Sequence, residues 1–295
     1  MSEATAERSR VRGLVRDFVA LTKPRIISLL LVTTIAPMFV AGQPTWDLVL
    51  AVFVGGYLMA GGANAVNMYL DRDIDDRMTR TRLRPIPSGR MQPREALAFG
   101  LLLATTATFL LATFANVITA ALALAGFYFY VLLYTRWLKR STPQNIVIGG
   151  AAGAFPPLVG WAAVTGSLDL MAVYLFLIIF YWTPPHFWAL ALNKQQDYGN
   201  AGIPMAPLIW GEKETKRQMV WYSVVLIALT VLPWAMGALG LAYLVSALVL
   251  GAIFLWGALR VQFAADFVKP AWWLYAYSLL YLALLFAAMV VDRFI

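Results

Sequence analysis

The sequence predicts an all-α polytopic membrane protein in which nine helices cross the bilayer. Of its 295 residues, 61% are hydrophobic and 13% are charged, whereas soluble domains average about 45–50% apolar and about 25% charged residues. The apolar residues also form long uncharged blocks such as 26–40, where a soluble amphipathic helix would show a charge in every turn. In addition, the nine-helix arrangement places nearly all lysines and arginines on one side of the membrane. The bilayer is therefore the predicted solvent.

The individual spans follow from apolar stretches of about 20 residues, the length that crosses a bilayer as a helix. Charged or turn-forming residues bound each stretch. The connections near residues 115 and 238 are so short that two spans are easily counted as one. The nine predicted spans are 25–43, 47–70, 95–114, 116–135, 145–165, 169–192, 218–237, 241–259 and 272–291.

The basic residues decide the topology. If the N-terminus is cytoplasmic, every one of the 23 lysines and arginines except Arg293 lies in a cytoplasmic segment. The first 22 residues contain acids among their arginines, which argues against a mitochondrial presequence. We expect a bacterial cytoplasmic membrane, a cytoplasmic tail over 1–24, a single transmembrane domain over 25–295 and a periplasmic C-terminus. A mitochondrial inner membrane is the alternative.

Two scarce residue types restrict the chemistry. The chain has no cysteine, which excludes thiolate nucleophiles, disulfides and Cys-ligated metal centres. Its single histidine, His186, excludes any site that needs two. No nucleic-acid partner is expected.

The first long cytoplasmic loop, about 71–94, begins with an acidic pattern. Asn67, Asp71 and Asp75 fall on one helical stripe, because four residues advance an α-helix by about 40° beyond a full turn. Oxygen ligands at one-turn intervals suit Mg²⁺ better than zinc. The alternative is a solvated helix end whose acids pair with nearby arginines. The arginine-rich tract 80–90 directly downstream favours the metal, since Mg²⁺ among arginines is a typical diphosphate site.

The second long loop, about 193–217, repeats this pattern four spans later. Asn193 and Asp197 have the spacing of Asn67 and Asp71 and lie on the same predicted membrane side. The repeat predicts two pseudo-repeated four-helix units around a central cavity plus a C-terminal helix. It also predicts a second set of metal ligands, with a chance match as the alternative.

Other polar features are less specific. Lys139 and Arg140 close span four with a basic cluster that either binds phosphate or anchors the span at the membrane surface. Two prolines precede His186 and two interrupt span five at 156–157, and we expect both pairs to break their helices and line a cavity. His186 would then face that cavity as a ligand or proton-transfer group, unless it is a packing residue.

These residues resemble the UbiA-type membrane prenyltransferases. That family has an N-x-x-x-D-x-x-x-D motif after helix two, here Asn67, Asp71 and Asp75, and a second Asp-containing motif after helix six. The second motif keeps only Asp197, a reduction shared with the haem-farnesylating branch, whose product is haem o. Stretches that match this branch are Leu21-Thr-Lys-Pro-Arg25, Asp71-Arg-Asp-Ile-Asp75, Thr142-Pro-Gln-Asn145, Trp182-Thr-Pro-Pro-His186-Phe187-Trp188 and Asp197-Tyr198.

The resemblance implies a Mg²⁺-dependent transfer of a farnesyl group from farnesyl diphosphate to a vinyl group of haem b, with addition of water. It implies that Asn67, Asp71 and Asp75 hold one Mg²⁺ and that Asp197 supports another. His186 would orient the haem, and a downstream haem a synthase is the partner that such a product implies. The candidates to neutralise the leaving diphosphate are Arg25, Arg80, Arg84, Lys139 and Lys194.

Two alternatives remain at this point. An enzyme of the same family with an aromatic quinone precursor as acceptor would share the cytoplasmic motifs. A membrane transporter also fits repeats with interrupted helices, although transport would not require an acidic stripe beside a basic tract at one face.

Overall fold

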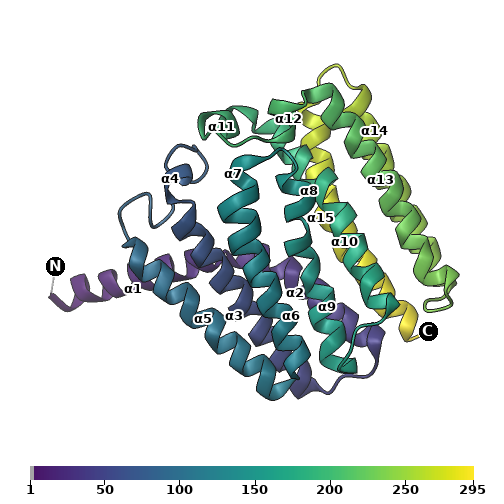
Figure 1. The fold of residues 1–295 in the computed structure, drawn as a ribbon, viewed down its shortest axis with the longest axis horizontal. Helices are drawn as coiled ribbons and strands as arrows, with labels where there is room; N and C mark the ends of the chain where they lie inside the picture. Colours follow the sequence, from purple (N-terminus) through teal and green to yellow (C-terminus); the bar gives the residue numbers. More distant parts are fainter. Residues whose placement is uncertain (1–2) are drawn as a thin grey trace.

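The computed structural model describes residues 3–295, and all regular secondary structure in that range is helical. Nine helical segments in it are long and apolar enough to cross a membrane, and they stand side by side in one bundle (Figure 1). The predicted all-α, nine-span architecture is therefore confirmed. The elements are α1 (Glu3–Thr22), α2 (Pro24–Ala41), α3 (Trp46–Leu70), α4 (Arg72–Asp75), α5 (Pro93–Phe114), α6 (Val117–Tyr128), η1 (Phe129–Leu138), α7 (Lys139–Ser141), α8 (Asn145–Gly149), α9 (Ala151–Thr165), α10 (Leu170–Asn193), α11 (Gln195–Asn200), α12 (Ala206–Ile209), α13 (Glu212–Ala235), α14 (Leu241–Phe263) and α15 (Val268–Arg293).

Polar caps fix the short connections. The Asn116 side chain accepts the backbone N–H of Thr119 at 2.9 Å, which starts α6 directly after α5. Asp169 starts α10 by accepting the N–H groups of Met171 and Ala172 at 3.0 and 3.2 Å. Such bonds satisfy amides that have no partner inside the helix. The tight turn near residue 115 therefore separates two spans, as predicted.

Residues 3–22, predicted only as part of a polar tail, form helix α1. Figure 1 shows α1 projecting sideways from the bundle. Its C-terminal half is attached to the first half of the protein, because Asp17 accepts a hydrogen bond from Arg90 Nε at 3.1 Å. Next to it, Phe18 packs edge-on against Phe99 with 4.8 Å between ring centroids.

Of the three apolar cores in the described residues, the two larger lie mainly in the first and in the second half of the chain. The first lies among α2, α3, α5 and α6 and includes Met38, Met59, Leu111 and Phe127. The second lies among α10, α13, α14 and α15 and includes Leu175, Met219, Phe254 and Tyr281. Helix α2 joins the halves, since it packs against both α9 and α15.

Glycines allow the closest helix crossings. A Cβ at Gly160 in α9 would collide with the carbonyl oxygen of Thr34 in α2. A Cβ at Gly62 in α3 would lie 2.6 Å from the carbonyl oxygen of Gly100 in α5. Small residues at such crossings let backbones approach, which is how helices associate in lipid.

The expectation that proline pairs break their spans is wrong. Helix α10 continues through Pro184 and Pro185, and α9 continues through Pro156 and Pro157. Next to Pro184, the Thr183 hydroxyl donates a hydrogen bond to the carbonyl of Ile179 at 2.8 Å. Breaking a helix in lipid would leave more backbone groups unpaired than retaining it, so the continuous helix is favoured.

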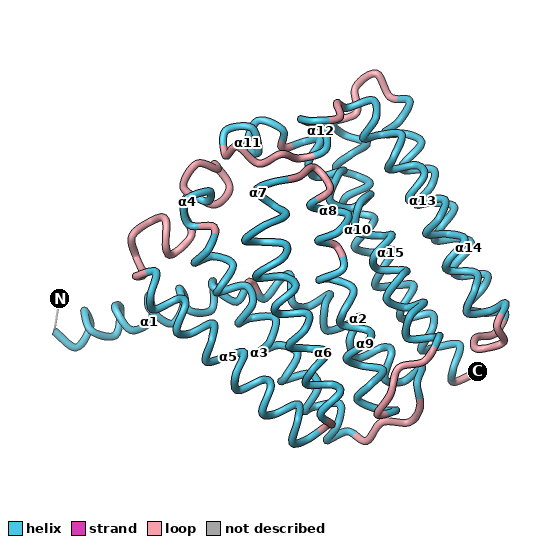
Figure 2. Tube along the Cα trace, viewed as in Figure 1, coloured by secondary structure: helices cyan, strands magenta, loops and turns pink. Residues whose placement is uncertain are grey.

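The C-terminal part of span four is a π-helix, η1, which the sequence did not indicate. π-helical turns are uncommon and are frequent at functional sites. In η1, Tyr130 stacks on Tyr134 with 5.6 Å between ring centroids, and Thr135 lies within hydrogen-bond distance of Asn67 in α3. The longer connections, with α4, α11 and α12, gather at this end of the bundle (Figure 2). The irregular part of span four thus faces the motif-bearing loops.

Candidate functional site

An amide and two carboxylates are buried where α3 ends. Asn67 is 4% exposed, and Asp71 and Asp75 are each 1% exposed. Although α3 stops at Leu70, the amide of Asp71 still bonds the carbonyl of Asn67, and that of Asp75 bonds the carbonyl of Asp71 at 2.7 Å. The helical spacing therefore continues into α4, and the predicted stripe is present. Asn67 Nδ2 donates to Asp71 Oδ2 at 2.8 Å and to Thr135 Oγ1 at 3.0 Å.

Each member of the stripe has its own cation. Lys139 Nζ lies 2.6 Å from Asp71 Oδ2, and Arg84 Nη1 lies 2.6 Å from Asp75 Oδ2. Lys23 Nζ donates to Asn67 Oδ1 at 2.9 Å. A buried carboxylate needs a nearby cation of this kind, because removing its charge from water costs on the order of several kcal/mol. The cations come from three separate segments, so the charged cluster exists only in the folded protein.

Lys23 was not among the predicted site residues. It is the only non-glycine residue with a positive φ angle, 55°, in the described chain. That left-handed conformation is strained for a lysine and is concentrated at functional sites in proteins. Burial, and then the neighbouring charge of Arg84, lowers the Lys23 pKa to about 7. Its place in the matching stretch Leu21–Arg25 is the one sequence signal that pointed to it.

Arg140 forms the outer edge of the cluster. Its guanidinium binds Asp73 through two hydrogen bonds of 2.7 and 2.8 Å and donates to the carbonyl of Leu70 at 2.8 Å. These bonds hold the pKa of Asp73 at about 2. The solvated-helix-end alternative thus describes Asp73, which is exposed, but not Asp71 or Asp75, which are buried.

The donor set fits a magnesium ion that also binds substrate oxygens. Asp71 Oδ1 is buried without a hydrogen-bond partner, with Arg140 Nη2 3.7 Å away. Among the described residues, no three His, Cys, Asp or Glu side chains form a group that holds a metal on its own. Mg²⁺ is usually held by one or two carboxylates together with phosphate oxygens, which is what Asp71 and Asp75 offer.

The five predicted diphosphate-binding residues are not equally placed. Arg84 and Lys139 lie in the cluster, as described above. Arg25 and Arg80 are exposed side chains. Lys194 lies over the ring of Trp272, with 5.8 Å from Nζ to the centroid.

The second motif does not copy the geometry of the first. Helix α10 ends at Asn193, so Asp197 lies on the separate helix α11 rather than one turn further along the same helix. Asn193 Nδ2 bonds its own helix at the carbonyl of Ala189, and its Oδ1 is buried without a partner. Asp197 is half-buried, and its role as a second metal ligand stays a prediction.

Tyr198 connects the two motif-bearing loops. Burial raises the pKa of this tyrosine, the charges of Arg80 and Arg84 oppose that rise, and Tyr275 and Asp197 add to it. Tyr198 lies in the same apolar core as Ile74 and Met78 of the first loop. The second loop therefore packs against the first.

His186 is a buried ring with one free nitrogen. Trp182 and Tyr275 stack on it, with centroid distances of 4.4 and 4.8 Å and interplanar angles of 16° and 21°. Its Nδ1 lies 2.6 Å from Ser278 Oγ, whose own proton goes to the carbonyl of Tyr275 at 2.7 Å. The proton between His186 and Ser278 is thus on Nδ1, and Nε2 keeps its lone pair.

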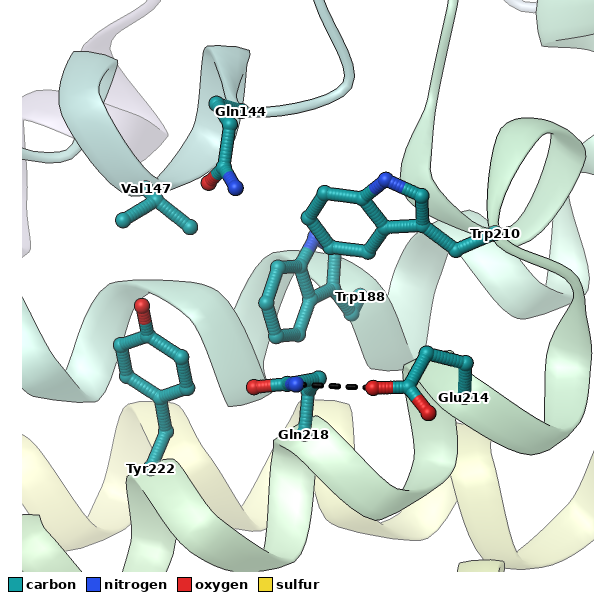
Figure 3. Close-up of a pocket in the computed structure, with 7 residues that line it drawn as sticks. All are labelled: Gln144, Val147, Trp188, Trp210, Glu214, Gln218 and Tyr222. Atoms are coloured by element: carbon teal, nitrogen blue, oxygen red, sulfur yellow. Dashed lines mark hydrogen bonds between the residues drawn. The ribbon is translucent and has the colours of Figure 1, made fainter.

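A separate cavity of about 270 Å³ lies between α8, α10 and the start of α13 (Figure 3). Trp188 meets Trp210 and Tyr222 edge to face, with 5.8 and 5.5 Å between centroids. Gln218 Nε2 donates to Glu214 Oε1 at 2.8 Å, as the dashed line in Figure 3 marks. None of the predicted site residues lines this cavity.

Comparisons with known proteins identify the family of this chain. Residues 29–282 match the model of the UbiA prenyltransferase family. A protoheme IX farnesyltransferase of Symbiobacterium thermophilum is 52% identical over 95% of this chain and 94% of its own length. Another, from Roseiflexus castenholzii, is 56% identical over 95% of this chain but only 53% of its own length. The chain spans about half the length of the first three curated relatives it matches.

A solved structure shares the fold. It is a UbiA homologue from Archaeoglobus fulgidus bound to DMAPP and Mg²⁺, with a TM-score of 0.69 and 15% sequence identity. The similarity covers 93% of this chain and 99% of the other.

Proposed function

This chain belongs to the UbiA prenyltransferase family, and we propose that it transfers the farnesyl group of farnesyl diphosphate to a vinyl group of haem b, with addition of water, to give haem o. The observation that carries the proposal is the buried stripe of Asn67, Asp71 and Asp75 surrounded by cations at one end of an apolar bundle. The relatives named for haem farnesylation supply the acceptor.

The stripe supports the metal-binding part of the proposal. Asp71 and Asp75, with the amide oxygen of Asn67, would hold Mg²⁺, which neutralises charge on the leaving diphosphate when bound. Thr135 fixes Asn67 by accepting its Nδ2 proton, and the bond from Asn67 to Asp71 fixes the carboxylate. Asp197 on α11 is the candidate to support a second ion.

The cations act on the leaving group. Breaking the C1–O bond of farnesyl diphosphate places the electron pair on the diphosphate, and Arg84, Lys139 and Lys23 already point their charges at the stripe. Each of them exchanges a carboxylate or amide oxygen for a diphosphate oxygen when substrate binds. The remaining candidates, Arg25, Arg80 and Lys194, extend this basic rim.

The aromatic groups act on the other product of ionisation. The stacked rings of Tyr130 and Tyr134 lie in η1, the helix whose Thr135 contacts Asn67. Ring faces attract cations by about 0.5–2 kcal/mol, so they stabilise the allylic cation that remains at C1. The vinyl carbon of haem b forms the new bond to C1. Water then adds to the resulting cation and loses a proton, which completes the hydroxyethylfarnesyl group.

His186 is the candidate haem-orienting residue. Its ring stacks on Trp182 and Tyr275, and its Nδ1 bonds Ser278, so the lone pair of Nε2 is the group left to bind haem iron or a protonated propionate.

The test of the whole proposal is to incubate the purified protein with Mg²⁺, farnesyl diphosphate and haem b. The expected product is haem o by mass. Prenylated hydroxybenzoate or naphthoate would instead assign a quinone precursor as acceptor, and absence of any product, with substrate movement across vesicles, would indicate a transporter.

The proposal includes the membrane, the orientation of the chain and a partner enzyme. The enzyme is placed in the bacterial cytoplasmic membrane with a cytoplasmic N-terminus and a periplasmic C-terminus, because this orientation puts the basic loops inside. Its product makes a downstream haem a synthase the expected partner.

A further inference from the structure

A second cavity lies outside the proposed diphosphate site. It has a volume of about 340 Å³ and is lined by Tyr69, Arg72, Gln92, Pro93 and Arg94. These residues come from the end of α3 and the start of α5, two helices that pack side by side (Figure 1). Although Arg72 follows Asp71 in sequence, its guanidinium lies over the Tyr69 ring, 4.7 Å from the centroid, and not against the buried carboxylates.

Arg72 is held in place although no acid among the described side chains pairs with it. Its Nη1 donates to the carbonyl of Tyr69 at 2.7 Å, which together with the ring contact fixes the guanidinium plane. By contrast, Arg84, Lys139, Arg140 and Arg90 are all paired with aspartates. A positioned guanidinium with free N–H groups is a ready binding group for phosphate.

Two acids close in sequence to these arginines already have hydrogen-bond partners. Asp73 accepts both hydrogen bonds from Arg140. Glu95 accepts the backbone N–H of Gln92 at 2.9 Å and thereby caps α5. Because Arg140 neutralises Asp73 and Glu95 keeps one negative charge, the two arginines of the cavity, Arg72 and Arg94, retain a net positive charge against these two acids.

The face of α5 that continues from Arg94 is apolar and partly exposed. Leu97 and Leu101 follow Arg94 at helical spacing on the same face, and Leu101 is 48% exposed. In a membrane-spanning helix, an exposed leucine faces acyl chains. Tyr69 adds an aromatic ring at the level where tyrosines concentrate in membrane proteins, the headgroup region.

We propose that this cavity binds the phosphate group of an anionic phospholipid of the cytoplasmic leaflet, with Arg72 and Arg94 on the phosphate and the acyl chains along Leu97 and Leu101. Basic pockets between membrane helices on the cytoplasmic side recognise anionic headgroups in this manner. The proposal does not depend on the reaction that the enzyme catalyses.

The test is native mass spectrometry of the full-length protein in detergent, titrated with phosphatidylglycerol. The wild type should retain one phosphatidylglycerol more tightly than phosphatidylcholine of the same chain length. The double variant Arg72→Gln/Arg94→Gln should bind phosphatidylglycerol about tenfold more weakly. Arg77→Gln/Arg82→Gln, which removes two exposed arginines of the same loop outside the cavity, is the matched control and should bind as the wild type does.

Three outcomes would overturn the proposal. Equal loss in the control variant would show that only the general charge of the loop matters. Unchanged binding in Arg72→Gln/Arg94→Gln would place the lipid elsewhere. Competition by inorganic phosphate at the same concentration as the lipid would make the ligand a soluble phosphate.

Thermal unfolding in lipid-free detergent is the folding control, and the variants should match the wild type. The single variant Arg94→Gln provides a second test and should weaken phosphatidylglycerol binding partially.

Discussion

At the scale of single residues, the proposed chemistry depends on groups that are buried yet incompletely paired. Asp71 has one oxygen bound to Lys139 and Asn67 and another that is buried without a partner. A buried polar atom left unpaired costs about 1–3 kcal/mol, so proteins keep such atoms where they serve a purpose. The orphaned oxygen is the position at which a bound ion would regain that energy.

Replacing Asp71 tests this position. We expect Asp71→Ala to reduce turnover at least about 100-fold, because both the ion and the fixed position of Lys139 depend on this carboxylate. The protein should still insert and fold, as judged by yield and gel filtration in detergent. Asp73→Ala is the matched control, since Asp73 is exposed and binds only Arg140, and it should keep most of the activity. Full activity of Asp71→Ala at saturating Mg²⁺ would remove Asp71 from the metal site.

His186 has a different role and a different test. His186→Ala should weaken haem use about tenfold or more while binding of farnesyl diphosphate is retained, because the ring contacts Trp182, Tyr275 and Ser278 rather than the charged cluster. Ser278→Ala should give a smaller effect, since it removes only the bond that fixes the Nδ1 proton. Spectroscopic titration with haem b measures both. Unchanged haem affinity in His186→Ala would exclude the residue from the haem site.

At the scale of helices, packing distances at glycines decide which spans meet. Helix α9 crosses α2 at Gly160, where the nearest atom to an added Cβ is the backbone carbonyl oxygen of Thr34. Backbone cannot rotate away as a side chain does, so the two helices would have to separate. The π-helical stretch η1 is a second such feature, since it brings Thr135 to Asn67 across the first half.

A glycine substitution tests the crossing. Gly160→Ala should destabilise the protein by about 3 kcal/mol, at the upper end of overpacking costs. Gly153→Ala lies in the same helix but has nothing within 4 Å of the added Cβ, so it should leave stability unchanged or slightly raised. Thermal unfolding in the same detergent compares the two. Equal melting temperatures would mean that α2 and α9 pack less closely than described.

At the scale of the whole molecule, the two halves place their long loops at one end of the bundle (Figure 2). The chain contains no cysteine, so single cysteines can report its orientation directly. Thr79 lies in the first long loop, and Ser167 lies in a short turn at the other end, and both are exposed.

Labelling should distinguish the two ends. In intact cells whose outer membrane is permeabilised, a membrane-impermeant maleimide should modify Ser167→Cys but not Thr79→Cys. After the inner membrane is opened, both should react. The reverse pattern would place the basic loops outside, against the positive-inside bias. Activity of both variants serves as the folding control.

Much of this architecture was predictable from the sequence. The spans followed from apolar length and the positions of arginines, because lipid imposes the same requirement on every crossing helix. The stripe of Asn67, Asp71 and Asp75 followed from helical spacing, and the structure shows it. The proline breaks were predicted wrongly, since the freed carbonyls do not require a break: both helices stay continuous, with the Thr183 hydroxyl bonding the carbonyl of Ile179 beside Pro184.

The sequence by itself determined the fold class, the number of spans and the candidate acids, since these depend on composition and on neighbours along one helix. Only the tertiary structure decided which cations meet those acids, because Lys23, Arg84 and Lys139 come from segments far apart in the chain. It also decided that Asp197 lies on a helix of its own and that Ser278 and Tyr275 hold His186. Contacts of this kind depend on how helices pack against one another, and no local spacing encodes that.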